Sequence, residues 1–286
     1  SFPTRRSSDL NNSVKLFPDK RGLAGGLTTG VYGLSSVLVP PVANVMIRNW
    51  GVSAAFQIIA VCFAVVLLLA SAFVEQGPEE AGQMLPGGGR DMSWREMLCQ
   101  KKFYGMCAML LCGGLSGMMV ISSASDMAQV EAGFSPAAAA LMVSVLSLFN
   151  AGGRASAGIL SDKLGRIGTL SLVFPISVAA LCALFFFGQD SMAVFAVSIA
   201  LVGACFGALM GIFPGFTADE FGQRNNTVNY GILFFGFALS GMLGPQVASW
   251  VMSGTGSYRS AFLIAAVVAL AGFALTFLHR RLAARS

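Results

Sequence analysis

The chain has 286 residues, of which 55% are hydrophobic and only 11% are charged, and its formal net charge is +5. Soluble domains carry about 25% charged residues, so this composition excludes an ordinary soluble protein and favours a polytopic membrane protein. The basic residues are spread over short segments between long apolar runs instead of forming one patch, which argues against a nucleic-acid partner.

The first ten residues stand apart from the rest of the chain. Their sequence, SFPTRRSSDL, is similar to the conceptual translation of a short sequencing adapter. We therefore expect residues 1–10 to be an artefactual extension and exclude them from fold reasoning. The coding sequence is then expected to begin within a gene, near Asn11, with upstream helices missing.

Eight apolar runs follow, and each is long enough to cross a bilayer core at a rise of about 1.5 Å per residue. They cover residues 23–47, 54–74, 103–125, 137–160, 169–187, 192–216, 229–252 and 261–278. A hydrophilic connector over residues 75–102 separates the second run from the third, and its segment SWREML predicts a short surface helix. The predicted fold class is therefore all-α and polytopic.

The distribution of Lys and Arg predicts the orientation of these spans. One set of span ends holds 13 of these residues, whereas the opposite set holds only Arg48 and Arg259. Because loops rich in Lys and Arg stay on the cytoplasmic side, we expect the C-terminus and the 75–102 connector to be cytoplasmic in a cell inner membrane.

One basic residue, Arg154, lies inside an apolar span. An arginine at the centre of a membrane helix costs about 2.5–3.5 kcal/mol on insertion scales, so it marks a functional site by default. Asn150 lies one helical turn earlier on the same face.

The same span ends in the sequence GILSDKLGR, which has the pattern G-x-L-S-D-K-x-G-R. The motif joins two spans, and in this position it resembles a loop of the major facilitator superfamily. It contains Gly158, Asp162, Lys163, Gly165 and Arg166. Glycines allow two helix ends to approach closely, and the charges can hold the turn at the membrane surface.

The segment FPDKRGLA, at residues 17–24, resembles the loop after helix 4 of the oxalate:formate antiporter family. This resemblance implies that the spans correspond to helices 5–12 of a twelve-helix transporter. Residues 11–74 would end the N-terminal half, residues 75–102 would join the halves, and residues 103–286 would form the C-terminal six-helix half.

The resemblance also implies a binding site. Arg154 matches a helix-8 arginine that faces the pore and binds a substrate carboxylate, with Asn150 and Tyr230 adding hydrogen bonds; the alternative is a fixed structural pairing of Arg154 with a neighbour. Oxalate-type members carry a second cation, a lysine, where this chain has Phe237. A single buried cation favours a monocarboxylate of pyruvate, lactate or formate size. Asp162, Lys163 and Arg166 would close a cytoplasmic gate.

Asp126, at the end of the third span, is open to two interpretations. It is either a proton-coupling acid or gate partner, or a solvated carboxylate at a helix end, and the polar neighbours Gln129 and Glu131 favour the second. His279, the one histidine, is expected to be a residue of the membrane interface and not a proton relay, and Gly203, Gly207 and Gly211 form a face for helix packing.

The sequence therefore predicts a secondary transporter of a small organic anion, and not an enzyme. No cofactor or metal is expected, because the sequence has no P-loop, HExxH motif or Cys/His cluster. The expected partners are the carboxylate, membrane lipid, and protons or a counter-anion, with the protein a monomer. The alternatives are a non-transporting carboxylate sensor, an oxalate/formate-type dicarboxylate antiporter or, least favoured, a membrane enzyme.

Overall fold

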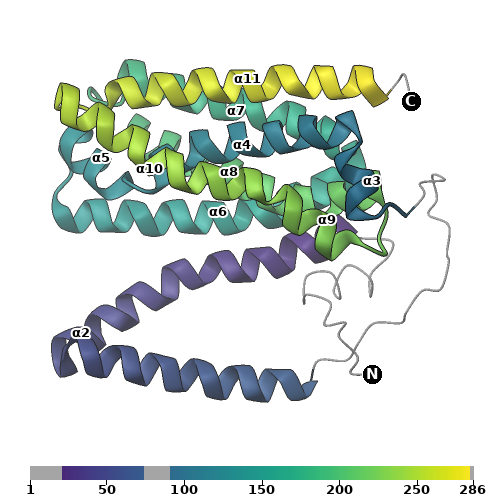
Figure 1. Cartoon of the computed structure of the whole chain (residues 1–286). Coiled ribbons are helices and arrows are strands. Elements are labelled where there is room, and N and C mark those ends of the chain that lie inside the picture. The colour runs from purple at the N-terminus through teal and green to yellow at the C-terminus, as the bar shows by residue number, and fades with distance from the viewer. Residues whose placement is uncertain (1–20, 74–90, 284–286) are drawn as a thin grey trace.

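The structure, a computed structural model, describes residues 21–73 and 91–283, and the expectations for residues 1–10 and most of the 75–102 connector lie outside this part. Within it the chain is helical (Figure 1). The helices are α2 (Arg21–Phe73), α3 (Trp94–Leu98), α4 (Lys101–Ile121), α5 (Ala124–Ala132), α6 (Pro136–Leu164), α7 (Arg166–Phe187), α8 (Met192–Phe221), α9 (Asn226–Leu233), α10 (Phe235–Thr255) and α11 (Arg259–Ala283). Among the described residues, seven helices are long and apolar enough to cross a membrane.

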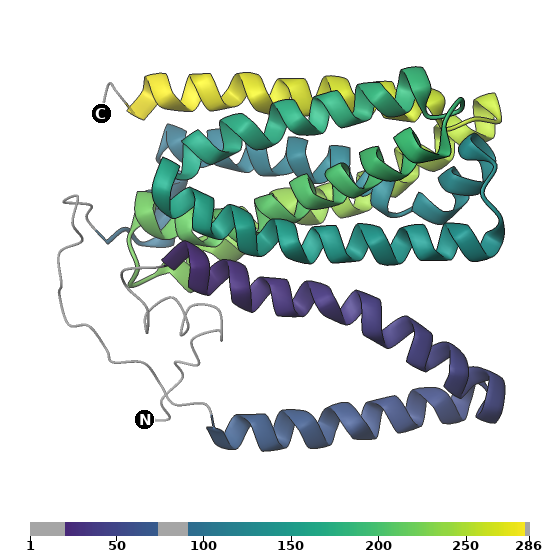
Figure 2. The ribbon, with the colours of Figure 1, turned by 180° about the vertical axis from the view of Figure 1, so that it is seen from behind.

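The helices from α4 to α11 form one bundle in which successive long helices run in opposite directions (Figures 1 and 2). Helix α6 packs on α8, α4 packs on α10 and α11, and α7 packs on α8 and α11. We call the end of the bundle with the α6–α7 turn, the α8–α9 connection and the last turn of α11 the basic end. The opposite end, with α5 and the α10–α11 connection, is the far end.

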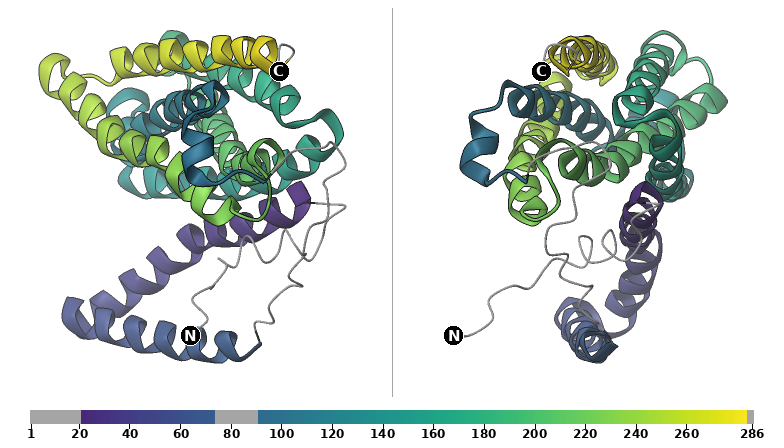
Figure 3. Two further views of the ribbon diagram at one scale, coloured as in Figure 1. Left: turned by 45° about the vertical axis from the view of Figure 1, so that its right-hand side comes forward. Right: turned by 90° about the vertical axis from the view of Figure 1, so that its right-hand side faces the viewer.

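Helix α2 is a hairpin of two helical legs that meet at the far end (Figure 3). The bend lies at Gly51, where φ is 80° and ψ is 168°, a backbone conformation that glycine adopts without a Cβ clash. The first leg lies beside α6 and α8, whereas the second lies apart and exposes apolar side chains such as Leu68. The predicted span 23–47 is helical as the first leg, but it is not one of the seven helices above.

Two other predicted spans are interrupted. The span predicted at 229–252 is two helices, α9 and α10, which meet at Phe234. The span predicted at 103–125 ends in a turn at Ser122, and α5 begins directly after it. The short helix predicted within SWREML is α3, where Ser93 and Glu96 form a capping box.

Candidate functional site

The glycine face of α8 brings α6 into direct backbone contact. A Cβ atom at Gly203 would lie 2.8 Å from the carbonyl oxygen of Leu146, and at Gly207 and Gly211 it would meet the carbonyl oxygens of Asn150 and Arg154. The contact is mutual, since a Cβ at Gly153 of α6 would meet the Ala204 carbonyl. No side chain fits between the helices here, which agrees with the packing role expected for these glycines.

This contact fixes the part of α6 that carries Arg154. The Arg154 side chain is buried, and its Nε donates a hydrogen bond of 3.0 Å to Oδ1 of Asn150, four residues earlier on the same helix face. Tyr230, half-buried in α9, lies close enough to Arg154 for the two side chains to interact electrostatically. The structure thus places Asn150 in contact with Arg154, and Tyr230 lies within electrostatic range of that pair.

An aromatic row extends from Tyr230 across α10 to α8. Ring centroids lie 5.4 Å apart for Tyr230 and Phe234, 4.6 Å for Phe234 and Phe237, and 5.7 Å for Phe237 and Phe206. Phe237 is therefore packed among aromatic rings at the position where oxalate-type relatives have a lysine.

The motif residues gather at the basic end around Arg166. Its Nη1 donates to Oδ1 of Asp162 at 3.0 Å and to Oγ of Ser161 at 2.5 Å, and its Nε donates to Oδ2 of Asp219 at 2.8 Å. Asp219 lies near the end of α8, so Arg166 joins the ends of α6 and α8 at the start of α7. We call these four side chains the Arg166 latch.

The glycines of the motif allow this approach. Gly165 has a φ of 76°, in the left-handed region, so the chain can turn directly from α6 into α7. Gly158 is buried, and its carbonyl accepts a hydrogen bond from Ser161 at 2.8 Å. Lys163 is exposed and, within the described part of the chain, makes no hydrogen bond or ion pair.

Replacing Arg166 with glutamine should lower the free energy of unfolding by about 2 kcal/mol, because a mostly buried guanidinium would lose its charged hydrogen-bond partners. The matched control is Lys163→Gln, which removes a neighbouring charge that has no such contacts. Thermal denaturation of the two purified variants in detergent measures the difference. Equal midpoints for Arg166→Gln and the wild type would contradict the latch.

The end of the connector is anchored on the α8–α9 turn, which the sequence did not predict. The backbone N–H of Met92 donates to the Phe221 carbonyl at 2.9 Å, and the Met92 carbonyl accepts from Nδ2 of both Asn225 and Asn229 at 3.1 Å. Because Asn229 directly precedes Tyr230, this anchor fixes the helix turn that presents Tyr230.

Two acidic side chains of α5 at the far end differ in burial. Asp126 is exposed and makes no hydrogen bond or ion pair within residues 21–73 and 91–283. Glu131, interpreted from the sequence only as a polar neighbour of Asp126, is buried and accepts hydrogen bonds from Gln189 Nε2, Ser257 Oγ and the Tyr258 backbone N–H. These donors come from the α7–α8 and α10–α11 connections, so burial of Glu131 depends on tertiary contacts that the local sequence does not reveal.

The burial of His279 was not evident from the sequence. Its side chain is 1% exposed and lies near Glu220 of α8 at the basic end. The local sequence, LHRRL, suggested an interface because two arginines follow the histidine directly.

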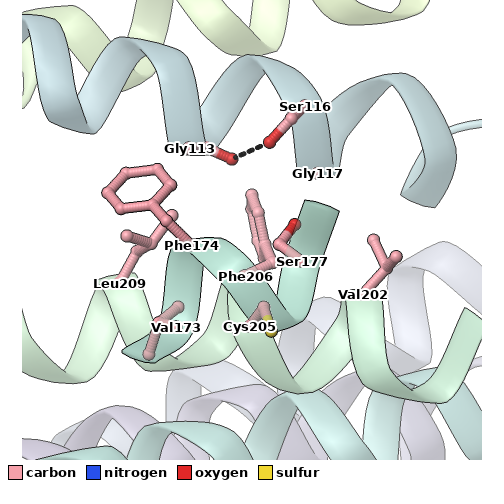
Figure 4. A pocket seen from close by; sticks show the side chains of 10 residues that line it. All are labelled: Gly113, Ser116, Gly117, Val173, Phe174, Ser177, Val202, Cys205, Phe206 and Leu209. Carbon is pink, nitrogen blue, oxygen red and sulfur yellow. Dashed lines mark hydrogen bonds between the residues drawn. The ribbon is translucent and has the colours of Figure 1, made fainter. Parts of the chain in front are cut away.

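A small cavity lies between α4, α7 and α8 (Figure 4). Apolar side chains dominate its wall, and Figure 4 shows the hydroxyl of Ser116 bonded to the Gly113 carbonyl of its own helix. Its lining includes neither Arg154 nor Asn150 nor Tyr230, so this cavity is separate from the predicted carboxylate site.

Comparison with known proteins identifies the family. The pattern of the Major Facilitator Superfamily matches residues 11–245. The uncharacterized MFS-type transporter YhjX of Escherichia coli (strain K12) is 30% identical over 231 residues, which are 80% of this chain and 57% of that protein. The oxalate:formate antiporter of Oxalobacter formigenes is 28% identical over 276 residues, 96% of this chain and 65% of that protein.

A more distant relative, monocarboxylate transporter 12 of Xenopus laevis, is 27% identical over 150 residues, 52% of this chain and 31% of that protein. The chain therefore spans less than two thirds of the length of these relatives. The crystal structure of the Escherichia coli fucose:proton symporter FucP has the same fold, with a TM-score of 0.66 at 16% identity over 94% of this chain and 72% of that one. The chain is a multi-pass membrane protein and belongs to the Major Facilitator Superfamily, and these relatives are transporters, not enzymes.

Proposed function

We propose that the whole protein is a secondary transporter that carries a small monocarboxylate, of pyruvate, lactate or formate size, by alternating access. The observation that carries this proposal is the buried guanidinium of Arg154, oriented by Asn150 and within electrostatic range of Tyr230. A guanidinium binds a carboxylate through two parallel N–H···O hydrogen bonds, and it stays charged at any physiological pH.

The choice of a monocarboxylate over a dianion rests on Phe237. A second carboxylate would need a second cation, and this position contributes an aromatic ring packed on Phe234 and Phe206. Burying an unpaired carboxylate against such rings is costly, since a charge taken out of water requires a partner. The printed names of two relatives, a monocarboxylate transporter and an oxalate:formate antiporter, agree with a small carboxylate as the substrate class.

The Arg166 latch would close the basic end during the transport cycle, and it would have to open when the substrate site faces that side. We place the basic end, the connector and the C-terminus in the cytoplasm, because the basic loops gather there and the positive-inside rule then applies. Protons or a counter-anion would supply the driving force, with the protein working as a monomer in lipid at the cell inner membrane.

Uptake by proteoliposomes containing the whole protein tests the proposal. Radiolabelled pyruvate, lactate, formate and oxalate are offered at equal concentration, with protein-free liposomes as the control. We expect the monocarboxylates to enter at least about ten times faster than oxalate, since a tenfold difference needs only about 1.4 kcal/mol of discrimination. Oxalate as the fastest substrate would instead identify a dicarboxylate antiporter, and saturable binding without any uptake would identify a sensor.

A further inference from the structure

Three titratable side chains from three different helices meet at the basic end, away from Arg154. Lys102 is the second residue of α4, Glu220 lies in the last turn of α8, and His279 lies near the end of α11. Lys102 Nζ is 3.3 Å from one carboxylate oxygen of Glu220, and His279 Nε2 is 3.6 Å from the other. The carboxylate therefore stands between the ammonium group and the imidazole.

The imidazole of His279 is buried, and its contact with Glu220 is longer than an ordinary hydrogen bond. Neither ring nitrogen has a hydrogen-bond partner within the described part of the chain. The ring packs edge-on against Phe216 at 5.2 Å between centroids, and it lies beside Gly105 of α4, where a Cβ would be 3.7 Å from Nδ1. Buried polar atoms are nearly always bonded, so an imidazole that faces a carboxylate at this distance can form a closer hydrogen bond with it if the two helices move together.

Adding a proton to His279 would change this arrangement. The protonated ring is a charged donor, and charge-assisted N–H···O bonds are about 2.7–2.9 Å long, shorter than the present separation. Glu220 would then be held by two cations, and α11 would be drawn toward α8. Histidine is also the side chain whose ordinary pKa lies between pH 5 and 8, where small changes in surroundings switch its charge.

The other charged groups near this cluster are already engaged elsewhere. On α11, Arg280 donates to the Ser171 hydroxyl of α7 at 3.1 Å. On α7, Arg166 is bonded to Asp162 and Asp219. On α3, the Arg95 guanidinium lies over the Trp94 ring. Lys102 and Glu220 are therefore the charged groups that face His279 from α4 and α8.

The last turn of α8 connects this cluster to the Arg166 latch. Asp219 holds Arg166, and the next residue, Glu220, faces Lys102 and His279. A movement of α11 relative to this turn would therefore also change the contacts of the Arg166 latch.

We propose that His279, together with Glu220 and Lys102, is a proton-binding site that couples movement of the anion to movement of a proton, with the last turn of α8 relaying the change to the Arg166 latch. The inference rests on the proposed transport function and adds the coupling ion to it. It moves the proton-coupling role from Asp126, which is exposed and has no described partner, to a buried group with a carboxylate beside it.

The test separates exchange from net transport in proteoliposomes containing the whole protein. Exchange of labelled for unlabelled pyruvate needs no net proton movement, whereas uptake driven by an imposed proton gradient does. We expect the pyruvate exchange rate of His279→Gln to be within about twofold of the wild-type rate. Stimulation of its uptake by the proton gradient should be at least tenfold smaller, and its uptake should no longer depend on pH between pH 6 and 8. The matched control is the adjacent Arg280→Gln, which should keep both activities.

If His279→Gln does not fold, a second variant tests the proton site. Glu220→Gln keeps the imidazole but removes its anionic partner, so the midpoint of the pH profile for gradient-driven uptake should move to lower pH. The proton site would be overturned by any one of three results. These are an unchanged midpoint in Glu220→Gln, wild-type stimulation by the gradient in His279→Gln, and uptake by the wild type that the gradient does not stimulate. Absence of wild-type exchange for any of the carboxylates would instead count against the transport function itself.

Discussion

Replacing Arg154 with glutamine is expected to abolish uptake of the monocarboxylate while leaving the amount of folded protein in the membrane unchanged. Glutamine removes the charge and the paired donors, and hydrogen bonds to charged groups are each worth about 1.5–3 kcal/mol. The loss should therefore be about 100-fold or more, since each 1.4 kcal/mol is a factor of ten. Insertion should not suffer, because a span without a buried charge inserts more easily.

Arg154→Lys completes this series. Lysine keeps the charge but loses the planar fork of two donors, so uptake should fall about tenfold without vanishing. The matched control is Gly152→Ala, on the same helix, where an added Cβ meets nothing within 4 Å. If Arg154 served only a structural pairing, glutamine would strand its partner, and the amount of protein in the membrane would fall together with activity.

Gly207→Ala is expected to prevent stable packing of α6 against α8. The added Cβ would be forced against the carbonyl oxygen of Asn150, which belongs to the backbone and cannot rotate away. Overpacking of this kind costs about 1–3 kcal/mol or more, and here it would also shift the residue that orients Arg154. We therefore expect both the yield of monodisperse protein and the uptake rate to drop strongly.

Size-exclusion chromatography and thermal denaturation of Gly207→Ala beside Gly152→Ala measure this effect. Both substitutions add one methyl group to a glycine in a membrane helix, so only the local contact differs. Equal elution profiles and equal denaturation midpoints would show that α6 and α8 are not in backbone contact at this point.

Much of the fold could be predicted from the sequence, because the bilayer imposes a simple rule on it. An apolar run of sufficient length must be a helix, since backbone groups in lipid can be satisfied in no other local way. This rule located the helices and the family motif at the end of α6. Spacing along one helix also placed Asn150 beside Arg154, and the structure has a hydrogen bond of 3.0 Å between them.

What the sequence did not predict depends on partners from other helices. Glu131 is buried because donors arrive from two distant connections, and His279 is buried because α4 and α8 cover it. The anchor of Met92 on Asn225 and Asn229 joins segments more than a hundred residues apart. No local pattern of charge or hydropathy identifies such contacts. The roles of Arg154, Tyr230 and the Arg166 latch in transport stay predictions.

Equilibrium binding of labelled pyruvate to the purified whole protein tests the central claim most directly, because binding at Arg154 precedes any question of coupling or direction. The wild type should bind pyruvate saturably, and unlabelled lactate should displace it more effectively than oxalate. Arg154→Gln, compared at an equal amount of folded protein, should bind at least about 100-fold more weakly. Wild-type affinity in Arg154→Gln would contradict the account, because the carboxylate would then be held elsewhere.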